Sequence, residues 1–268
     1  MKVFISVDIE GINGVCNWDE TETNKANYEQ FRAQLQREVN AACEGAIAAG
    51  ATEIFIKDAH DSARNLKIME LPECAKLHRG WDSTPCCMMA GLDETFDAVM
   101  FVGYHSPSRS NGNPLAHTMN TTRVQHVKIN GKIASEFTIN SLYAASLGVP
   151  VAFVSGDLNL CNQAKEINGN IETVATKEGR NGAVISDHPL VTCRKIKEGA
   201  EASLKKDLKD NVVYMPKGFD VEIQYRHHTQ ASNASFFPGC KLLGSDKVLY
   251  HSDNYNDVLV MFKFLLSI

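Results

Sequence analysis

The chain has 268 residues, of which 44% are hydrophobic and 22% are charged, a composition typical of folded globular proteins and far from that of disordered ones. Its 27 basic and 32 acidic residues give a formal net charge of −5, which disfavours nucleic acid and anionic membrane surfaces as partners. No stretch approaches the roughly 18 apolar residues of a membrane span, and no signal-peptide core begins the chain, so we expect a cytoplasmic protein.

The first half of the chain predicts a parallel sheet. Short β-branched and apolar runs are typical of buried strands, at residues 2–7, 52–57, 98–102 and 149–154. Apolar residues at four-residue steps from Phe31 to Ile47 predict a helix over residues 28–49 that ends at Gly50. A strand, a helix and a second strand form a β-α-β unit, whose two strands must be parallel.

The remaining elements continue this pattern, and those after about residue 160 predict a second, smaller part. Asn130-Gly131, between alternating residues, predicts the turn of a hairpin over residues 125–133. The further predicted elements are helices at 138–147, 189–206 and 255–266 and strands at 212–215, 219–225 and 247–250. We therefore predict an α/β fold, with a parallel-sheet domain over residues 1–160 and a smaller α/β part over residues 161–268 that shares an interface with it.

Acidic and histidine side chains follow the four strands predicted for the first half. In chain order, these side chains are Asp8 and Glu10, then His60, then His105, then Asp157. Because ligands of open parallel sheets bind beyond the carboxyl ends of the strands, we expect these groups to point towards one crevice. Such an arrangement is typical of a metal site or of a hydrolase.

The spacing of the first two acids favours a metal. Asp8 and Glu10 are two residues apart, so in an extended segment both carboxylates point to the same side. Two carboxylates held this close repel each other unless a cation compensates their charge. His60 and His105 add imidazole ligands, and a mixed shell of imidazoles and carboxylates suits zinc. Glu136, which follows the hairpin and begins a helix, is a fifth candidate ligand.

Each candidate also has an ordinary structural explanation. Asp8 could occupy a turn, Glu136 could stabilise a first helical turn, and a single histidine is more often packed or solvated than metal-bound. Asp58 and Asp61 could either form turns or accept a hydrogen bond from the histidine ring between them. The coincidence of acids and histidines at three strand ends favours the metal site. His117 lies in a loop without periodicity, so a catalytic role is one interpretation of it.

Five segments carry these residues. They are SVDIEGINGV (6–15), KDAHDSARNL (57–66), GLDETFDAVMFVGYHS (91–106), LAHTMN (115–120) and KINGKIASEFTINSLYAASLGVPVAFVSGD (128–157). In this order they resemble the D-aminopeptidases of the DppA type, a family of zinc peptidases. The resemblance covers about the first 157 residues, whereas the C-terminal part is similar only in character.

The resemblance implies an enzyme that removes the N-terminal residue from short peptides, D-amino-acid peptides in particular. By analogy, two zinc ions per chain are bound by Asp8, Glu10, His60, His105 and Glu136, with Asp8 bridging them. The same analogy makes His117 the residue that the family assigns as its catalytic nucleophile. Chemically, His117 could attack the carbonyl group itself, or it could act as a general base and acid or as an oxyanion stabiliser.

The family is also known for a ring-shaped homodecamer, so the resemblance implies a cyclic homo-oligomer. The helix predicted at 255–266 is apolar on nearly all sides. Either burial in the core or a subunit interface explains this composition.

Two positions depart from the family pattern. Ser135 stands where the family usually has Gly, and Leu158 stands where it usually has a second Asp after Asp157. No predicted ligand is missing, so we expect these changes to affect substrate preference and pocket shape more than metal binding. Two alternatives remain open, namely another dinuclear-metal hydrolase such as a phosphoesterase and a metal-binding oligomer with little activity. A phosphoesterase would usually carry a Gly-rich phosphate loop or basic cluster, and the sequence has neither near these motifs.

Overall fold

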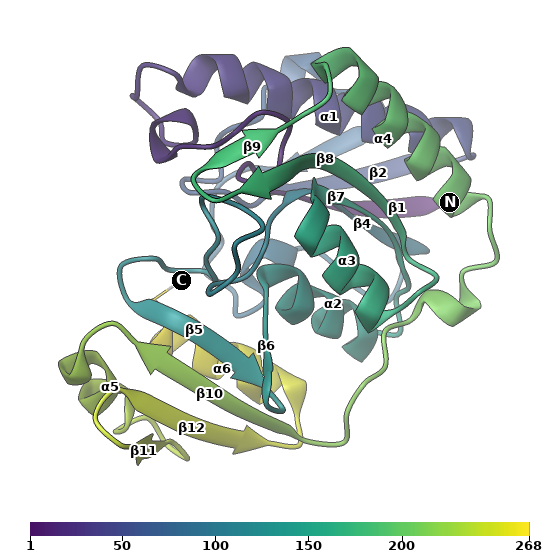
Figure 1. Ribbon diagram of the computed structural model, residues 1–268. Coiled ribbons are helices and arrows are strands. Elements are labelled where there is room, and N and C mark those ends of the chain that lie inside the picture. Colours follow the sequence, from purple (N-terminus) through teal and green to yellow (C-terminus); the bar gives the residue numbers. More distant parts are fainter. Residues whose placement is uncertain (268) are drawn as a thin grey trace.

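The computed structural model describes residues 1–267 and contains two β-sheets (Figure 1). In spatial order, the larger sheet consists of β3 (Ala75–His78), β2 (Glu53–Asp58), β1 (Lys2–Val7), β4 (Ala98–Tyr104), β7 (Val151–Asp157), β8 (Glu172–Arg180) and β9 (Ala183–Ile185). The smaller sheet consists of β11 (Lys241–Leu243), β12 (Lys247–Ser252), β10 (Phe219–Tyr225), β5 (Val124–Ile129) and β6 (Lys132–Ile133). Neighbouring strands of the larger sheet are parallel except β8 and β9, and those of the smaller sheet are antiparallel. The predicted α/β class is confirmed.

Helices cover both faces of the larger sheet (Figure 1). Helices α1 (Tyr28–Ala48) and α4 (Pro189–Leu204) pack together on one face, and α2 (Glu136–Ser146) and α3 (Leu158–Ile167) cover the other. Helices α5 (His228–Ala234) and α6 (Tyr255–Leu265) pack on the smaller sheet. Short 3-10 helices are η1 (Trp18–Glu20), η2 (Ile68–Glu70), η3 (Cys87–Met89) and η4 (Lys209–Asn211). Within residues 1–267, no helix is both long enough and apolar enough to cross a membrane.

Two hydrophobic cores hold these layers together. Alternate residues of β1 enter different cores, because successive side chains of a strand point to opposite faces. Val3 and Ile5 pack under α1 and α4, whereas Phe4 joins the core that extends to the smaller sheet. The apolar stripe predicted for α1 is buried at its centre, but Ile47 at its end is 41% exposed.

The C-terminal helix α6 belongs to the second of these cores. Its residues Val258, Met261, Phe262 and Leu265 are buried among side chains of β10, β12 and α2. Burial therefore accounts for most of its apolar character, and Phe264 remains 62% exposed.

Two features of the fold differ from the predicted elements. The strand predicted at 212–215 is wrong, because this segment connects α4 to β10 without pairing with any described strand. The predicted hairpin at 125–133 forms, but in the smaller sheet. Neither sheet lies on one side of residue 160, because β5 and β6 join the smaller sheet and β8 and β9 join the larger one. The sheets thus divide the chain differently from the predicted domain boundary.

Candidate active site

The site lies at the carboxyl ends of three adjacent parallel strands. β1 has β2 on one side and β4 on the other, so the chain changes direction across the sheet at β1, the place where open α/β sheets bind ligands. Asp8 and Glu10 follow β1, His60 follows β2, and His105 follows β4. The structure therefore brings together the four side chains that the strand ends predicted.

Asp8 lies between two imidazoles. Its Oδ1 is 3.3 Å from Nδ1 of His60, and its Oδ2 is 3.5 Å from Nε2 of His105. The His60 Nδ1 is also 3.1 Å from Oε2 of Glu10, and the His105 Nε2 is 3.6 Å from Oε1 of Glu136. Each oxygen of Asp8 thus faces one histidine and one further carboxylate, which is the geometry of a carboxylate shared by two cation positions.

Glu136 and His117 reach the cluster from the connection to the smaller sheet. Glu136 is the first residue of α2, where Ser135 caps the helix, and its Oε1 accepts a hydrogen bond from the Met119 N–H at 2.7 Å. The His117 Nε2 lies 3.6 Å from that oxygen and 3.9 Å from Oε1 of Glu10. Its ring stacks on His105 with centroids 4.3 Å apart. Glu136 therefore begins a helix and also enters the cluster.

Backbone carbonyls orient all three imidazoles. His60 Nε2 contacts the Thr21 oxygen at 2.9 Å, His105 Nδ1 contacts the Ser106 oxygen at 2.9 Å, and His117 Nδ1 contacts the Leu115 oxygen at 2.8 Å. A carbonyl oxygen only accepts hydrogen bonds, so each of these nitrogens carries a proton. In a neutral ring, the other nitrogen then presents its lone pair to the carboxylates, as metal-ligating histidines do.

Burial and neighbouring charges shift the pKa values of the acids in opposite directions. Burial, reinforced by the nearby Glu10 carboxylate, raises the pKa of Asp8 well above its usual value. Burial also opposes ionisation of Glu10, but the His60 charge outweighs it and lowers the pKa of Glu10. Burial likewise opposes ionisation of Glu136, and the charge of His105 lowers its pKa. The cluster is thus an acidic site that needs positive charge.

The imidazoles respond differently to the same surroundings. Burial disfavours protonation of His105, but Glu136 and the other carboxylates outweigh it and raise the pKa of His105 to about 10. Burial is also outweighed at His60, whose pKa rises because of Glu10 and Asp8. For His117, burial and the charge of His105 lower the pKa. His117 is therefore the imidazole of the site that stays neutral.

The donor set fits metal ions. Asp8 Oδ2, Glu10 Oε2 and His105 Nε2 are buried and have no hydrogen-bond partner among residues 1–267, although buried polar atoms are normally paired. Ligand atoms of Asp8, Glu10 and His60 lie within 4.8 Å of one another, as do those of Asp8, His105 and Glu136. These two groups share Asp8, and their nitrogen and oxygen donors suit zinc. A third such group, Glu10, His105 and His117, overlaps both.

Comparison with known proteins identifies the family. The sequence profile of a peptidase family described as D-aminopeptidase matches residues 1–264. The chain belongs to the D-aminopeptidase family. A protein of Bacillus subtilis (strain 168) named D-aminopeptidase is 31% identical over 267 residues, which cover 97% of this chain and 96% of that protein. A solved structure described as the Zn-dependent D-aminopeptidase DppA from Bacillus subtilis, a self-compartmentalizing protease, matches with a TM-score of 0.92 and 29% identity, covering 100% of this chain and 97% of the other.

Two aspartates of this family member stabilise the loops that carry His60 and His105. Asp157 was expected to point into the crevice but does not line it, because it caps α3 and accepts hydrogen bonds from the Ser106 N–H at 2.7 Å and the Asn113 side chain at 3.2 Å. It thereby orients the residue after His105. Asp58 accepts hydrogen bonds from the backbone and side chain of Asn65, whose side chain also donates to the His60 oxygen at 2.8 Å. Neither Asp58 nor Asp61 hydrogen-bonds the His60 ring in the described part of the chain.

Lys177 is a supporting residue that the sequence did not reveal. It lies in β8, and its buried ammonium group donates hydrogen bonds to the backbone oxygens of Glu10 and Val15, each at 2.5 Å. Burial lowers the pKa of Lys177 to about 8. The loop that carries Glu10 is thus tied to a strand that lies beyond β7, three strands from β1.

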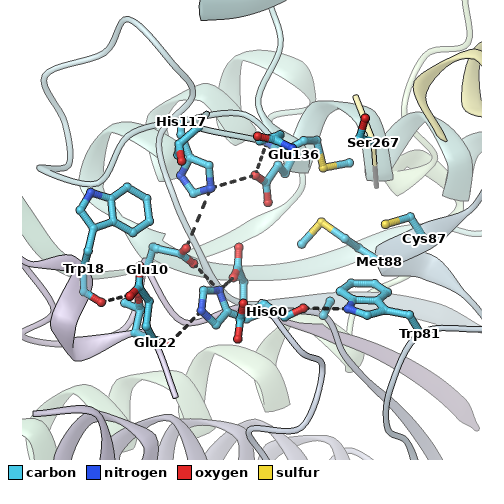
Figure 2. Close-up of a pocket in the computed structure, with 17 residues that line it drawn as sticks. Glu10, Trp18, Glu22, His60, Trp81, Cys87, Met88, His117, Glu136 and Ser267 are labelled. Atoms are coloured by element: carbon cyan, nitrogen blue, oxygen red, sulfur yellow. Dashed lines mark hydrogen bonds and ion pairs between the residues drawn. The ribbon is translucent and has the colours of Figure 1, made fainter. Parts of the chain in front are cut away.

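A cavity of about 480 Å³ opens over the cluster. Asp8, Glu10, His60, His117 and Glu136 line it, whereas His105 lies behind His117. Figure 2 shows two further walls, Trp18 beside His117 on one side and Trp81 beside Met88 and Cys87 on the other. Ser135 and Leu158, the departures from the family pattern, do not line the cavity.

Proposed function

We propose that this D-aminopeptidase family member is a zinc-dependent aminopeptidase that removes the N-terminal residue from short peptides of D-amino acids. The observation that carries the proposal is the buried cluster of three carboxylates and three carbonyl-anchored imidazoles beneath a cavity large enough for a small peptide. The Bacillus subtilis relatives, a D-aminopeptidase and the Zn-dependent D-aminopeptidase DppA, support the substrate class and the metal.

We propose two zinc ions per chain. One would be held by Asp8, Glu10 and His60 and the other by Asp8, His105 and Glu136. Zinc in such a site polarises a scissile carbonyl group and lowers the pKa of a water molecule towards ~7. Positive charge at both positions would also compensate the three buried carboxylates.

His117 supplies proton transfer in this proposal. Its Nδ1–H is held by the Leu115 oxygen, and its lowered pKa leaves Nε2 with a free lone pair that faces the cavity. Carboxylate oxygens of Glu136 and Glu10 lie 3.6 and 3.9 Å from Nε2 and stabilise the imidazolium that forms when the ring accepts a proton. The same proton can then pass to the departing amine. This charge stabilisation favours a role as general base and acid over a role as nucleophile.

The test measures metal content and activity on the same preparation. Protein purified without chelator is expected to contain two zinc ions per chain and to hydrolyse D-Ala-D-Ala. Removal of zinc by a chelator should abolish hydrolysis, and added zinc should restore it. One zinc ion per chain would contradict the dinuclear site. Activity on p-nitrophenyl phosphate without peptidase activity would instead support the phosphoesterase alternative. The cavity speaks against that alternative, because no lysine or arginine among residues 1–267 lines it.

We further infer that the chain assembles into a homodecamer, as its resemblance to the DppA-type enzymes implies. The description of the matched solved structure as a self-compartmentalizing protease supports an oligomer. The cytoplasmic location stays a prediction from the sequence.

A further inference from the structure

The cavity above the metal ligands has an apolar side that the proposed chemistry does not use. Trp81, Met88 and Cys87 form this side, opposite the polar side formed by Glu10 and His117 (Figure 2), and Ala59 and Met119 also line the cavity. The chain contains two tryptophans, and both line this cavity. Aromatic surface gathered beside a reaction centre is the usual means by which a pocket selects an apolar substrate group.

Trp81 is held rigidly although it is 41% exposed. Its Nε1–H donates a hydrogen bond of 2.7 Å to the Asp61 backbone oxygen, next to the ligand His60. The Lys57 ammonium group lies 4.3 Å from the centre of the ring and donates a hydrogen bond of 2.6 Å to the Gly80 oxygen. These contacts fix the polar edge and one face of the indole, so the ring is oriented before any substrate binds.

The charges of the cavity restrict which part of a substrate can enter. Besides the ligand carboxylates, Glu22 and Asp61 line it, and no lysine or arginine does so within residues 1–267. This acidic lining favours a substrate's free amino group. An amino-acid amide has this amino group and one side chain, so it probes the cavity without a second residue.

We propose that Trp81, together with Met88 and Cys87, forms a subsite for a large apolar, preferably aromatic, side chain of the N-terminal substrate residue. This inference rests on the proposed aminopeptidase function and adds a substrate class to it. Ring stacking on a fixed indole distinguishes a phenyl group from a methyl group by at least about tenfold in kcat/KM.

The test compares D-phenylalaninamide with D-alaninamide as substrates of the zinc-loaded enzyme. Both release ammonia, so the two substrates differ only in the side chain. The wild-type enzyme is expected to favour D-phenylalaninamide by at least about tenfold in kcat/KM. Trp81→Ala should lower kcat/KM for D-phenylalaninamide at least about tenfold more than for D-alaninamide and so remove this preference, and Trp81→Phe should largely restore it. Tyr214→Ala, which removes an aromatic side chain that is 77% exposed and outside the cavity, is the matched control and should change neither value.

A binding measurement separates the subsite from catalysis. D-phenylalaninol lacks the scissile group and should change the tryptophan fluorescence of the wild-type protein, whereas D-alaninol should not. The change should vanish in Trp81→Phe, which retains Trp18. A signal that persists in this variant would place the ring at Trp18 and overturn the assignment.

The possible outcomes separate this inference from the function on which it rests. Hydrolysis of both amides at equal rates would overturn the subsite and leave the aminopeptidase function standing. An equal loss on both amides in Trp81→Ala would show a general structural role and would also overturn the subsite. If the zinc-loaded wild-type enzyme hydrolyses neither amide, the proposed function itself fails.

Discussion

His117 differs from the other two imidazoles of the site in the direction of its pKa shift. Because burial and His105 lower its pKa, it can accept a proton at neutral pH, whereas the nearby carboxylates raise the pKa of His60 and His105. We expect His117→Ala to lower kcat for D-Ala-D-Ala by at least about 100-fold while zinc content stays at the wild-type value. Steady-state kinetics and metal analysis check this, and unchanged activity would favour the metal-binding oligomer with little catalysis.

Glu38 is a buried acid of α1 behind the site. Its Oε1 accepts hydrogen bonds of 2.9 Å from the Asn13 N–H and from the Gln34 side chain, while its Oε2 has no partner within residues 1–267. Burial raises the pKa of Glu38 to about 7, although these hydrogen bonds and the charge of Lys177 oppose the shift. The folded protein therefore binds this proton more tightly than the unfolded chain does, in which the pKa is about 4.5.

This difference predicts a stability change with pH. The contribution of Glu38 is fully present below about pH 4.5 and is lost as the pH rises through about 7. Glu38→Gln keeps the shape of the protonated acid, so the free energy of unfolding of this variant relative to wild type should rise by about 3 kcal/mol between pH 4.5 and pH 8. Urea unfolding at both pH values measures it. Glu44→Gln, on the exposed side of the same helix, should show no such trend.

At the level of elements, the site depends on the close approach of the segments after β1 and β4. The Gly11 N–H donates a hydrogen bond of 2.8 Å to the Gly103 oxygen, and a Cβ on Gly11 would lie 1.7 Å from the Tyr104 oxygen. Gly103 has a φ of +74°, and a Cβ there would lie 2.1 Å from the Asp8 oxygen. The close atoms are backbone oxygens of Tyr104 and Asp8, which cannot move aside without displacing the proposed ligands His105 and Asp8.

Gly11→Ala is therefore expected to lower the free energy of unfolding by about 3 kcal/mol or more and to reduce zinc binding. The matched control is Gly182→Ala in the turn between β8 and β9, where an added Cβ meets no atom within 4 Å. This control should change stability by less than about 1 kcal/mol. Thermal unfolding and zinc titration compare the two variants, and wild-type behaviour of Gly11→Ala would show that the strand ends are less tightly packed than the structure indicates.

At the level of the whole molecule, assembly is the property to measure. Large apolar side chains remain exposed on several elements, among them Met69 at 93%, Phe236 at 83% and Phe264 at 62%. Closed symmetric oligomers bury such surface. We expect light scattering at micromolar concentration to give a mass about ten times the 29.5 kDa of one chain. A mass near 29.5 kDa would contradict the decamer.

The sequence by itself determined the elements with strong local patterns and the residue types at the ends of β1, β2 and β4. Alternating apolar runs and the stripe of α1 are properties of neighbouring residues, so they can be read without the fold. Parallel strands have their carboxyl ends on one edge, so the sequence predicted that four side chains lie close together, namely Asp8, Glu10, His60 and His105. Glu136 and His117 were candidates from their residue type, and the family resemblance assigned their roles, since nothing in their local pattern places them beside these strands.

Only the tertiary structure decided those strands and cavity-lining side chains that depend on residues distant in the sequence. β8 has a polar composition and forms a strand because β7 and β9 pair with it, and it brings Lys177 behind Glu10. The segment 212–215 has strand composition but no described strand beside it, so it stays irregular. Trp18 begins the short helix η1 and Trp81 lies in a loop, and no periodicity predicts the conformation of either segment. Local preference was therefore sufficient for the sheet edge that holds the ligands, whereas long-range packing decided which side chains surround the substrate.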